Sequence, residues 1–148
     1  MAVTLAWVLM PNHFHFLVRI KGDETLSGFG TPTGLKPPHQ YFSNLFNAYT
    51  QAYNKVYKRH GALFERPFRR KLIDDEYFLK NVLLYIHNNP VHHSFCDHPA
   101  DYLWSSYHDY FSDASDGLPR DEVVELFGDF DNFNYVHEEK SIDRNIEL

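Results

Sequence analysis

The sequence has little cysteine, no long apolar run and no leader-like opening. Cys96 is the single cysteine among 148 residues, so an internal disulfide framework is excluded. Apolar residues never continue for the ~18 positions that a membrane span requires, and no charged stretch precedes an apolar one at the start. These absences predict a cytoplasmic protein without a membrane partner.

Charge of both signs is present but is unevenly distributed along the chain. The formal net charge is −6, from 20 acidic and 14 basic residues. Residues 55–71 nevertheless hold seven of the bases and one acid, Glu65, whereas the chain from Asp109 onward holds twelve acids and three bases. A phosphate backbone responds to the local patch, so the basic run predicts a polyanionic partner. A solvated charged face is the alternative explanation.

The first part of the chain is typical of a β-hairpin. Residues 2–10, AVTLAWVLM, are almost all apolar and rich in strand-forming types. Residues 13–20, HFHFLVRI, resume the same character after a Pro-Asn turn, so we expect a hairpin over residues 3–20. The Gly-, Pro- and Ser-rich residues 21–38 predict a long loop, which is either mobile or functional.

Two helices are predicted in the middle of the chain. Apolar residues recur at three- and four-residue intervals over residues 40–57, which indicates an amphipathic helix. A second helix is expected to begin after Asp74 or Asp75, because aspartate caps helix starts. It is expected to end at Asn89-Pro90, because proline restricts the residue before it.

The remaining elements complete a mixed fold. Residues 62–73, ALFERPFRRKLI, are expected to form an edge strand, because their proline cannot donate a hydrogen bond to a sheet. Residues 120–127, RDEVVELF, predict a short helix, and irregular structure is expected after Gly128. The order of elements predicts an α+β fold with helices on one face of an antiparallel sheet.

Two histidines stand at alternate positions of the predicted hairpin. In a strand His13 and His15 share one face, with their Cβ atoms roughly 7 Å apart, so both imidazoles can converge on one divalent ion. Phe14 and Phe16 point to the other face and can fix the strand by packing. Two half-buried histidines satisfied by their neighbours would give the same pattern.

The second predicted helix carries a tyrosine and an asparagine at adjacent turns. Tyr85 and Asn89 are four residues apart and therefore share one side of the helix. Tyr85 falls beside the apolar stripe, which also suits a boundary tyrosine with a bonded hydroxyl, and Asn89 before proline also suits a helix end. His87 projects to the opposite side. Three further histidines are expected in a loop, without metal-ligand spacing: His92, His93 and His98.

Three stretches together resemble one protein family. They are AWVLMPNHFHFLV at residues 6–18, GALFERPFRRKLI at residues 61–73, and YIHNNPVHHSFCDHPADYLWSSY at residues 85–107. In this order they are similar to the motifs of the single-tyrosine HUH transposases, in particular the REP-associated tyrosine transposase-like branch of the insertion-sequence single-strand class. The resemblance runs from about residue 3 to residue 108.

The resemblance implies an active site and a reaction. The HUH motif maps to His13-Phe14-His15, whose histidines bind a divalent metal, Mg²⁺ or Mn²⁺. The nucleophilic tyrosine maps to Tyr85, and the polar residue that completes the metal site maps to Asn89. The implied reaction cleaves and rejoins single-stranded DNA through a 5′-phosphotyrosine intermediate, as in transposition. The implied partner is single-stranded or hairpin DNA in the nucleoid of a prokaryotic cytoplasm.

The basic run fits the same partner. Four aromatic residues lie within or just before the run of basic residues and could stack on unpaired nucleobases of DNA: Tyr53, Tyr57, Phe64 and Phe68. Alternatively, the aromatic side chains form core and the basic side chains are solvated. The predicted DNA-binding residues are Lys55, Lys58, Arg59, Arg66, Arg69, Arg70 and Lys71.

The chain departs from the family at its start. Family members carry a strand and a helix before the strand that contains AWVLMPNH, and this chain begins almost at that strand. The resemblance therefore implies a ferredoxin-like, RRM-like sheet without its first strand, an HUH-like catalytic domain over residues 1–108 and an acidic extension over residues 109–148. An unpaired sheet edge invites a second chain, so a homodimer is expected.

Two rival functions remain open. The chain could be an inactive or truncated nucleic-acid-binding remnant, or a metal-dependent phosphodiesterase that uses water in place of the tyrosine. A covalent protein–DNA adduct would separate the transposase-like reaction from both rivals.

Overall fold

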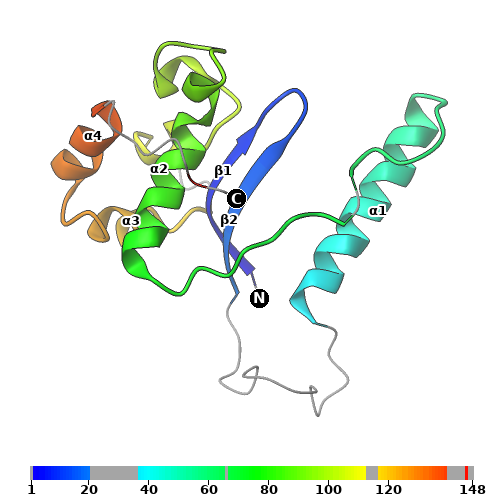
Figure 1. Ribbon diagram of the computed structural model, residues 1–148, viewed down its shortest axis with the longest axis horizontal. Coiled ribbons are helices and arrows are strands. Elements are labelled where there is room, and N and C mark those ends of the chain that lie inside the picture. Colours follow the sequence, from blue (N-terminus) through cyan, green and yellow to red (C-terminus); the bar gives the residue numbers. More distant parts are fainter. Residues whose placement is uncertain (1, 21–36, 66, 113–116, 140–145, 147–148) are drawn as a thin grey trace. The chain divides into compact units, whose positions relative to one another are not determined.

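A computed structural model describes residues 2–20, 37–65, 67–112, 117–139 and 146 of the chain (Figure 1). The chain divides into two compact units, one of residues 1–21 and 72–147 and the other of residues 22–71. We call them the hairpin unit and the α1 unit after an element that each contains. The loop predicted over residues 21–38 lies outside the described residues except for its last two positions, and Arg66 also lies outside them.

A two-stranded antiparallel hairpin opens the hairpin unit. Strand β1 (Ala2–Leu9) pairs with β2 (Phe14–Ile20) in a register that sets Val8 opposite His15. The Met10 N–H donates to the His13 carbonyl oxygen at 2.8 Å and closes the turn. The predicted hairpin is therefore confirmed.

Helix α2 (Glu76–His92) lies against both strands of the hairpin (Figure 1). It begins where the sequence predicts, because the Asp75 carboxylate accepts a hydrogen bond from the Phe78 N–H at 2.7 Å. Val82, Leu83 and Ile86 are almost fully buried along its length. Burial of such side chains stabilises the folded state by about 1.5–3 kcal/mol each, and it fixes the helix within the unit.

The end of α2 differs from the prediction. The helix does not stop at Asn89-Pro90 but continues through Pro90 to His92. Proline removes one backbone hydrogen bond from a helix interior, but Asn89 and Pro90 are both buried, and their packing offsets the loss. The helix ends only before Ser94, whose φ of 58° is left-handed. His92 therefore lies on the helix and His93 at its C-cap, so their predicted place in a loop is wrong.

The segment after α2 returns to the free edge of β1. It contains two 3-10 turns, η2 (Pro99–Asp101) and η3 (His108–Tyr110). Between them, the Leu9 N–H donates to the Trp104 carbonyl oxygen and the Ser106 N–H donates to the Trp7 carbonyl oxygen, both at 2.9 Å. Trp104 itself is 64% exposed, so this return is made by its backbone and not by burial of its ring.

Two short helices form the acidic tail of the hairpin unit. The predicted helix near residue 120 is confirmed as α3 (Arg120–Glu125). Irregular structure was expected after Gly128, but α4 (Phe130–Glu138) forms there, capped by Asp129, whose carboxylate accepts from the Asn132 N–H at 2.7 Å. Phe133 on α4 is fully buried. Helix formation here follows from aromatic burial, which a mostly polar sequence window conceals.

Two buried histidines join α4 to α2 and to the β1 edge. The His137 Nδ1–H donates to the Phe133 carbonyl oxygen at 2.7 Å, so the His137 Nε2 is an acceptor. The His87 Nδ1–H donates to that nitrogen at 2.9 Å, and the Ser106 hydroxyl lies 3.0 Å from the remaining His87 nitrogen. Burial lowers the pKa of His87 well below its usual value and lowers the pKa of His137 to about 4. The network therefore consists of neutral rings.

We expect the free energy of unfolding to fall as the pH is lowered from about 6.5 toward 4. The unfolded chain protonates His137 near pH 6.5, whereas the folded chain resists protonation down to about pH 4. Above about pH 6.5, neutral His137 makes its full contribution to the free energy of unfolding. This contribution, on the order of 3 kcal/mol, is lost as the pH falls from about 6.5 to about 4. Denaturant unfolding followed by circular dichroism across the window measures the loss. A His137→Gln variant should give a flatter profile, and an equally steep one would contradict the role of His137.

Helix α1 (Pro38–Val56) and the segment after it make up the α1 unit. The helix predicted over residues 40–57 is confirmed. The Phe46 ring lies 5.2 Å from Phe64 and 5.3 Å from Phe68, measured between ring centroids, so these rings form a small aromatic core. The edge strand predicted over residues 62–73 is wrong, because the described residues there form no strand and instead pack on α1 through these rings.

The described elements confirm an α+β fold. They comprise one two-stranded antiparallel sheet and four α-helices, with helices at the C-terminal end. Within the part of the chain that the structure describes, the search for a helix long and apolar enough to cross a membrane finds none.

Candidate active site

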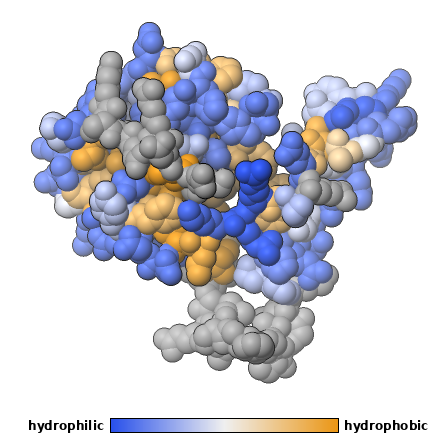
Figure 2. Space-filling view, viewed as in Figure 1, coloured by the Kyte–Doolittle hydropathy of each residue, from blue (hydrophilic) through white to orange (hydrophobic). Residues whose placement is uncertain are grey.

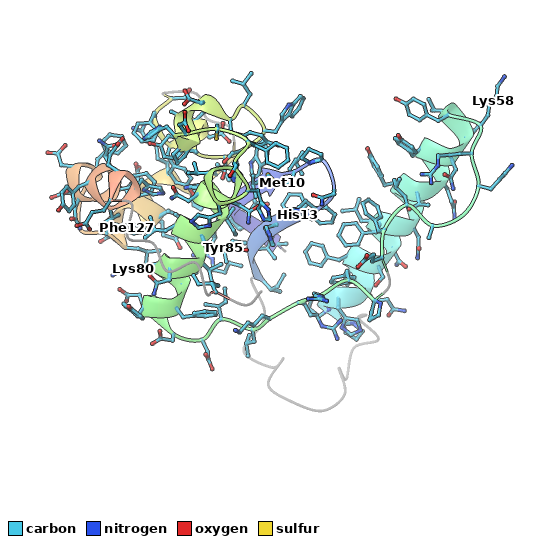
Figure 3. All side chains as sticks on the ribbon, turned by 45° about the horizontal axis from the view of Figure 1, so that its top comes forward. Met10, His13, Lys58, Lys80, Tyr85 and Phe127 are labelled. Carbon is cyan, nitrogen blue, oxygen red and sulfur yellow. The ribbon has the colours of Figure 1, made fainter. Side chains whose placement is uncertain are left out.

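The predicted histidine pair lies where the hairpin turn meets α2. His13 immediately precedes β2, and His15 is the second residue of that strand. Their ring centroids are 5.3 Å apart. Figure 3 shows His13 and Tyr85 in this region, and both belong to the hairpin unit. Sequence spacing and backbone geometry thus bring the two imidazoles close together.

Tyr85 has two imidazole neighbours. Its ring centroid lies 5.7 Å from that of His15 on the hairpin and 5.7 Å from that of His92, two turns later on α2. Tyr85 is half-buried between the buried residues Leu84 and Ile86, so its ring is packed at the edge of the core. A packed ring with a partly accessible hydroxyl is suited to nucleophilic attack, because its position is fixed.

Asn89 reaches the histidine pair from the next turn of α2. Its side-chain oxygen Oδ1 lies 2.9 Å from the His13 Nε2, although the residue itself is fully buried. The other ring nitrogen of His13, Nδ1, lies 2.7 Å from the Asn12 Oδ1. Both nitrogens of one imidazole therefore face amide oxygens.

This arrangement leaves a polar mismatch at the His13 Nε2. If the neutral ring carries its proton on Nδ1 and donates to Asn12, then the Nε2 lone pair points at the lone pairs of the Asn89 oxygen. A second proton, a turned Asn89 amide or a bound cation would each relieve the contact. The Asn89 Nδ2 has no hydrogen-bond partner among the described residues although it is buried. A turned amide would donate to the His13 Nε2 but would leave the Asn89 oxygen buried without a donor.

The geometry fits a divalent ion. Two ligand atoms bound at about 2.1 Å to neighbouring positions of an octahedral ion lie roughly 3.0 Å apart. The 2.9 Å between His13 Nε2 and Asn89 Oδ1 matches this separation. Among the described residues no group of three His, Cys, Asp or Glu side chains is arranged to hold a metal ion. Water and a phosphate oxygen suit the other positions of such an ion.

The electrostatics keep His15 available as a ligand. Burial, together with the smaller effects of the neighbouring rings of His13 and His93, lowers the pKa of His15 to about 4. An imidazole with that pKa is neutral at neutral pH and presents a lone pair. The His93 ring lies 5.0 Å from the His13 ring and so belongs to the same cluster.

The sequence analysis missed His92 and His93 as members of this cluster. Both were assigned to a loop because the helix was expected to end at Pro90. A helix continued through Pro90 sets His92 seven residues after Tyr85 and His93 four residues after Asn89, which are spacings of one helical face. This periodicity was present in the sequence and would have identified both residues.

The predicted DNA-binding residues belong to the α1 unit. Lys55 lies on α1, and Lys58 and Arg59 follow its end; Figure 3 shows Lys58 at that end of the helix. The other predicted bases follow in the segment after α1, which is irregular and not a strand: Arg69, Arg70 and Lys71. Arg66 is not among the described residues.

Comparison with known proteins gives one named relative. The chain is 28% identical to a protein of Haemophilus influenzae named "Putative REP-associated tyrosine transposase" over 110 residues, which cover 71% of this chain and 58% of that protein. The chain thus spans less than two thirds of the length of this curated relative. No protein-family model matches the chain, and no solved structure matches it. The name of this relative agrees with the resemblance found in the motifs.

Proposed function

We propose that the chain is a transposase-like enzyme that cleaves and rejoins single-stranded DNA with Tyr85 as its nucleophile. The observation that carries the proposal is the meeting of two segments in one unit. His13 and His15 come from the hairpin, Tyr85 and Asn89 come from α2, and a buried amide oxygen lies 2.9 Å from an imidazole nitrogen. The name of the Haemophilus relative agrees with this chemistry.

Tyr85 supplies the covalent step of the proposed reaction. Its Oη attacks the phosphorus of a phosphodiester, and the bond from phosphorus to the 3′ oxygen breaks. The fragment on the 3′ side of the break remains on Tyr85 through its 5′ phosphate as a phosphotyrosine ester, and the phenolic proton ends on the 3′-OH of the released fragment. Attack by a 3′-OH on the ester reverses the step, so strands are rejoined without an energy cofactor.

His13, His15 and Asn89 form the proposed metal site. They would hold Mg²⁺ or Mn²⁺, which when bound supplies positive charge to the scissile phosphate. With the His13 proton on Nδ1, the Asn12 Oδ1 would accept it and leave the other ring nitrogen facing Asn89. Burial of Asn89 fixes the amide oxygen in place. The chain therefore holds these groups in place without the metal.

The proposed substrate is single-stranded or hairpin DNA. The basic side chains of the α1 unit contact the phosphates of the DNA, and such contacts give affinity without sequence preference. A homodimer and a location in the prokaryotic cytoplasm, at the nucleoid, belong to the same proposal.

Covalent adduct formation tests the proposal. We expect a pool of hairpin oligonucleotides labelled at the 3′ end to yield, with Mn²⁺, a labelled species that migrates with the denatured protein. A 5′ label should leave with the released 3′-OH fragment, because the tyrosine retains the 5′ phosphate. A chelator should prevent both products. The protein–DNA species is measured on a denaturing gel and mapped to Tyr85 by mass spectrometry.

Other outcomes would support the rival functions. Metal-dependent cleavage without an adduct would indicate a phosphodiesterase that uses water. DNA binding without cleavage across the pool would indicate a nucleic-acid-binding remnant. An adduct at a residue other than Tyr85 would contradict the assignment of the nucleophile.

A further inference from the structure

Three tyrosines form a ladder at the C-terminal end of α1. Tyr49, Tyr53 and Tyr57 follow one another at four-residue intervals, so they lie above each other on one side of the helix, about 6 Å apart along its axis. The ring centroids of Tyr49 and Tyr53 are 6.2 Å apart, with the planes inclined by 28°. Those of Tyr53 and Tyr57 are 4.3 Å apart, with an inclination of 36°. The rings thus present a row of partly parallel faces.

Tyr53 and Tyr57 do not belong to the aromatic core of the α1 unit. The core rings are those of Phe46, Phe64 and Phe68, and of the three tyrosines Tyr49 has a ring contact with them, to Phe64 at 6.0 Å. Tyr57 is 63% exposed and Tyr49 is 54% exposed. Tyr53 is half-buried, and the exposed Tyr57 ring extends the row beyond the core, where a ligand can reach it.

Positive charge surrounds the ladder. The Arg59 guanidinium carbon lies 5.7 Å from the Tyr53 ring centroid, in a cation–π arrangement. A tight turn holds it there, because the Arg59 N–H donates to the Asn54 carbonyl oxygen and the Asn54 amide donates to the Gly61 carbonyl oxygen. Over the described residues of the α1 unit, six Lys and Arg side chains stand against one acid, Glu65.

We propose that Tyr49, Tyr53 and Tyr57 are a stacking track for unpaired bases of a nucleic acid strand, with Lys58 and Arg59, which follow the end of α1, contacting its phosphates. This inference rests on the proposed function for the identity of the strand as DNA. Every base has an aromatic face, so stacking on tyrosine tolerates any sequence, and basic side chains beside it follow the backbone. A duplex keeps its bases stacked on one another and cannot use the track.

Charge argues for nucleic acid over a protein partner on this surface. An apolar protein interface would favour an uncharged aliphatic helix face, whereas the visible part of α1 in Figure 2 is mainly hydrophilic with a small apolar patch. The excess of bases over acids in the unit complements a polyanion.

The test separates stacking from charge by using a strand without bases. Fluorescence anisotropy of the full chain is measured with labelled oligothymidylate and with an abasic oligonucleotide of equal length and charge. We expect a Tyr53→Leu, Tyr57→Leu double variant to lose at least about tenfold in affinity for oligothymidylate, equal to about 1.4 kcal/mol. Its affinity for the abasic strand should equal that of the wild type. Restoring the rings, as in Tyr53→Phe with Tyr57→Phe, should rescue the loss.

A matched control and a second readout keep the result unambiguous. Tyr41 lies on the same helix, is 53% exposed and is outside the ladder, so Tyr41→Leu should bind both strands as the wild type does. If the double variant loses helix content by circular dichroism, Tyr57→Leu alone is used, because Tyr57 follows the last helical residue. Photocrosslinking of a bromodeoxyuridine strand should map to the ladder tyrosines.

Three results would overturn the inference. Equal loss for both strands would assign the effect to charge, and no loss with crosslinks elsewhere would place the strand on another surface. A change in molar mass by light scattering, without a change in DNA affinity, would make the ladder a protein interface. Adduct formation at Tyr85 without any ladder effect would refute the track alone, whereas a ladder effect without an adduct would refute the proposed enzyme alone.

Discussion

Replacing Tyr85 with phenylalanine will abolish the covalent protein–DNA adduct. Phenylalanine retains the ring that lies 5.7 Å from His15 and 5.7 Å from His92, so the packing at the junction of hairpin and helix is preserved. It removes the oxygen that forms the ester. Loss of an enzyme nucleophile lowers the rate by several orders of magnitude, and we expect a fall of at least about 1,000-fold.

The same helix supplies a matched control for this change. Tyr77 is the second residue of α2 and is 76% exposed, about two turns before Tyr85 and the histidine cluster. A Tyr77→Phe variant should form the adduct at the wild-type rate, measured as labelled protein per unit time with Mn²⁺. Binding of the oligonucleotide should survive in both variants. Persistence of the adduct in Tyr85→Phe would show that another residue is the nucleophile.

A Phe133→Ala substitution will have the largest effect on stability. Phe133 is fully buried, and its ring lies 5.2 Å from Tyr110, 5.3 Å from Phe127 and 4.3 Å from His137. Truncation removes the centre of this aromatic cluster and leaves a cavity between α4 and the rest of the hairpin unit. Changes of this kind cost about 3–5 kcal/mol.

Denaturant unfolding measures this loss directly. Tyr135 lies two residues later on α4 and is 59% exposed, so Tyr135→Ala should change the free energy of unfolding by no more than about 0.5 kcal/mol. Detachment of the tail in Phe133→Ala should also release the His87–His137 contact. A destabilisation below about 1 kcal/mol would mean that the cluster packs more loosely than these ring distances indicate.

The sequence predicts those elements in which the pattern of apolar residues reflects the face that the element itself buries. The apolar, strand-forming runs before and after Pro11-Asn12 identified the hairpin, and the three- and four-residue spacing of apolar residues identified α1 and most of α2. Helix α4 was missed because its one fully buried side chain, Phe133, is held by rings distant in sequence. The strand expected around Pro67 was wrong for a related reason. A strand requires a partner, and local sequence does not reveal that Phe64 and Phe68 pack on a helix instead.

The candidate site was predicted to the extent that its spacing is local. His13 and His15 were placed together by strand alternation, and Tyr85 and Asn89 by helical repeat. Only the resemblance to a family suggested that the two pairs meet, since 76 residues separate His13 from Asn89. His92 was lost because Pro90 was taken as a helix end, a local rule that tertiary packing overrides.

The side chain of Asn89 imposes a cost on the folded state. A buried amide nitrogen without an acceptor costs about 1–3 kcal/mol, and the structure provides no acceptor for it among the described residues. Leucine has a similar volume and no polar atoms, so a chain selected for stability alone would gain by placing it there. The fold thus carries at this position a group that does not serve stability, as the proposed role of Asn89 in a site requires.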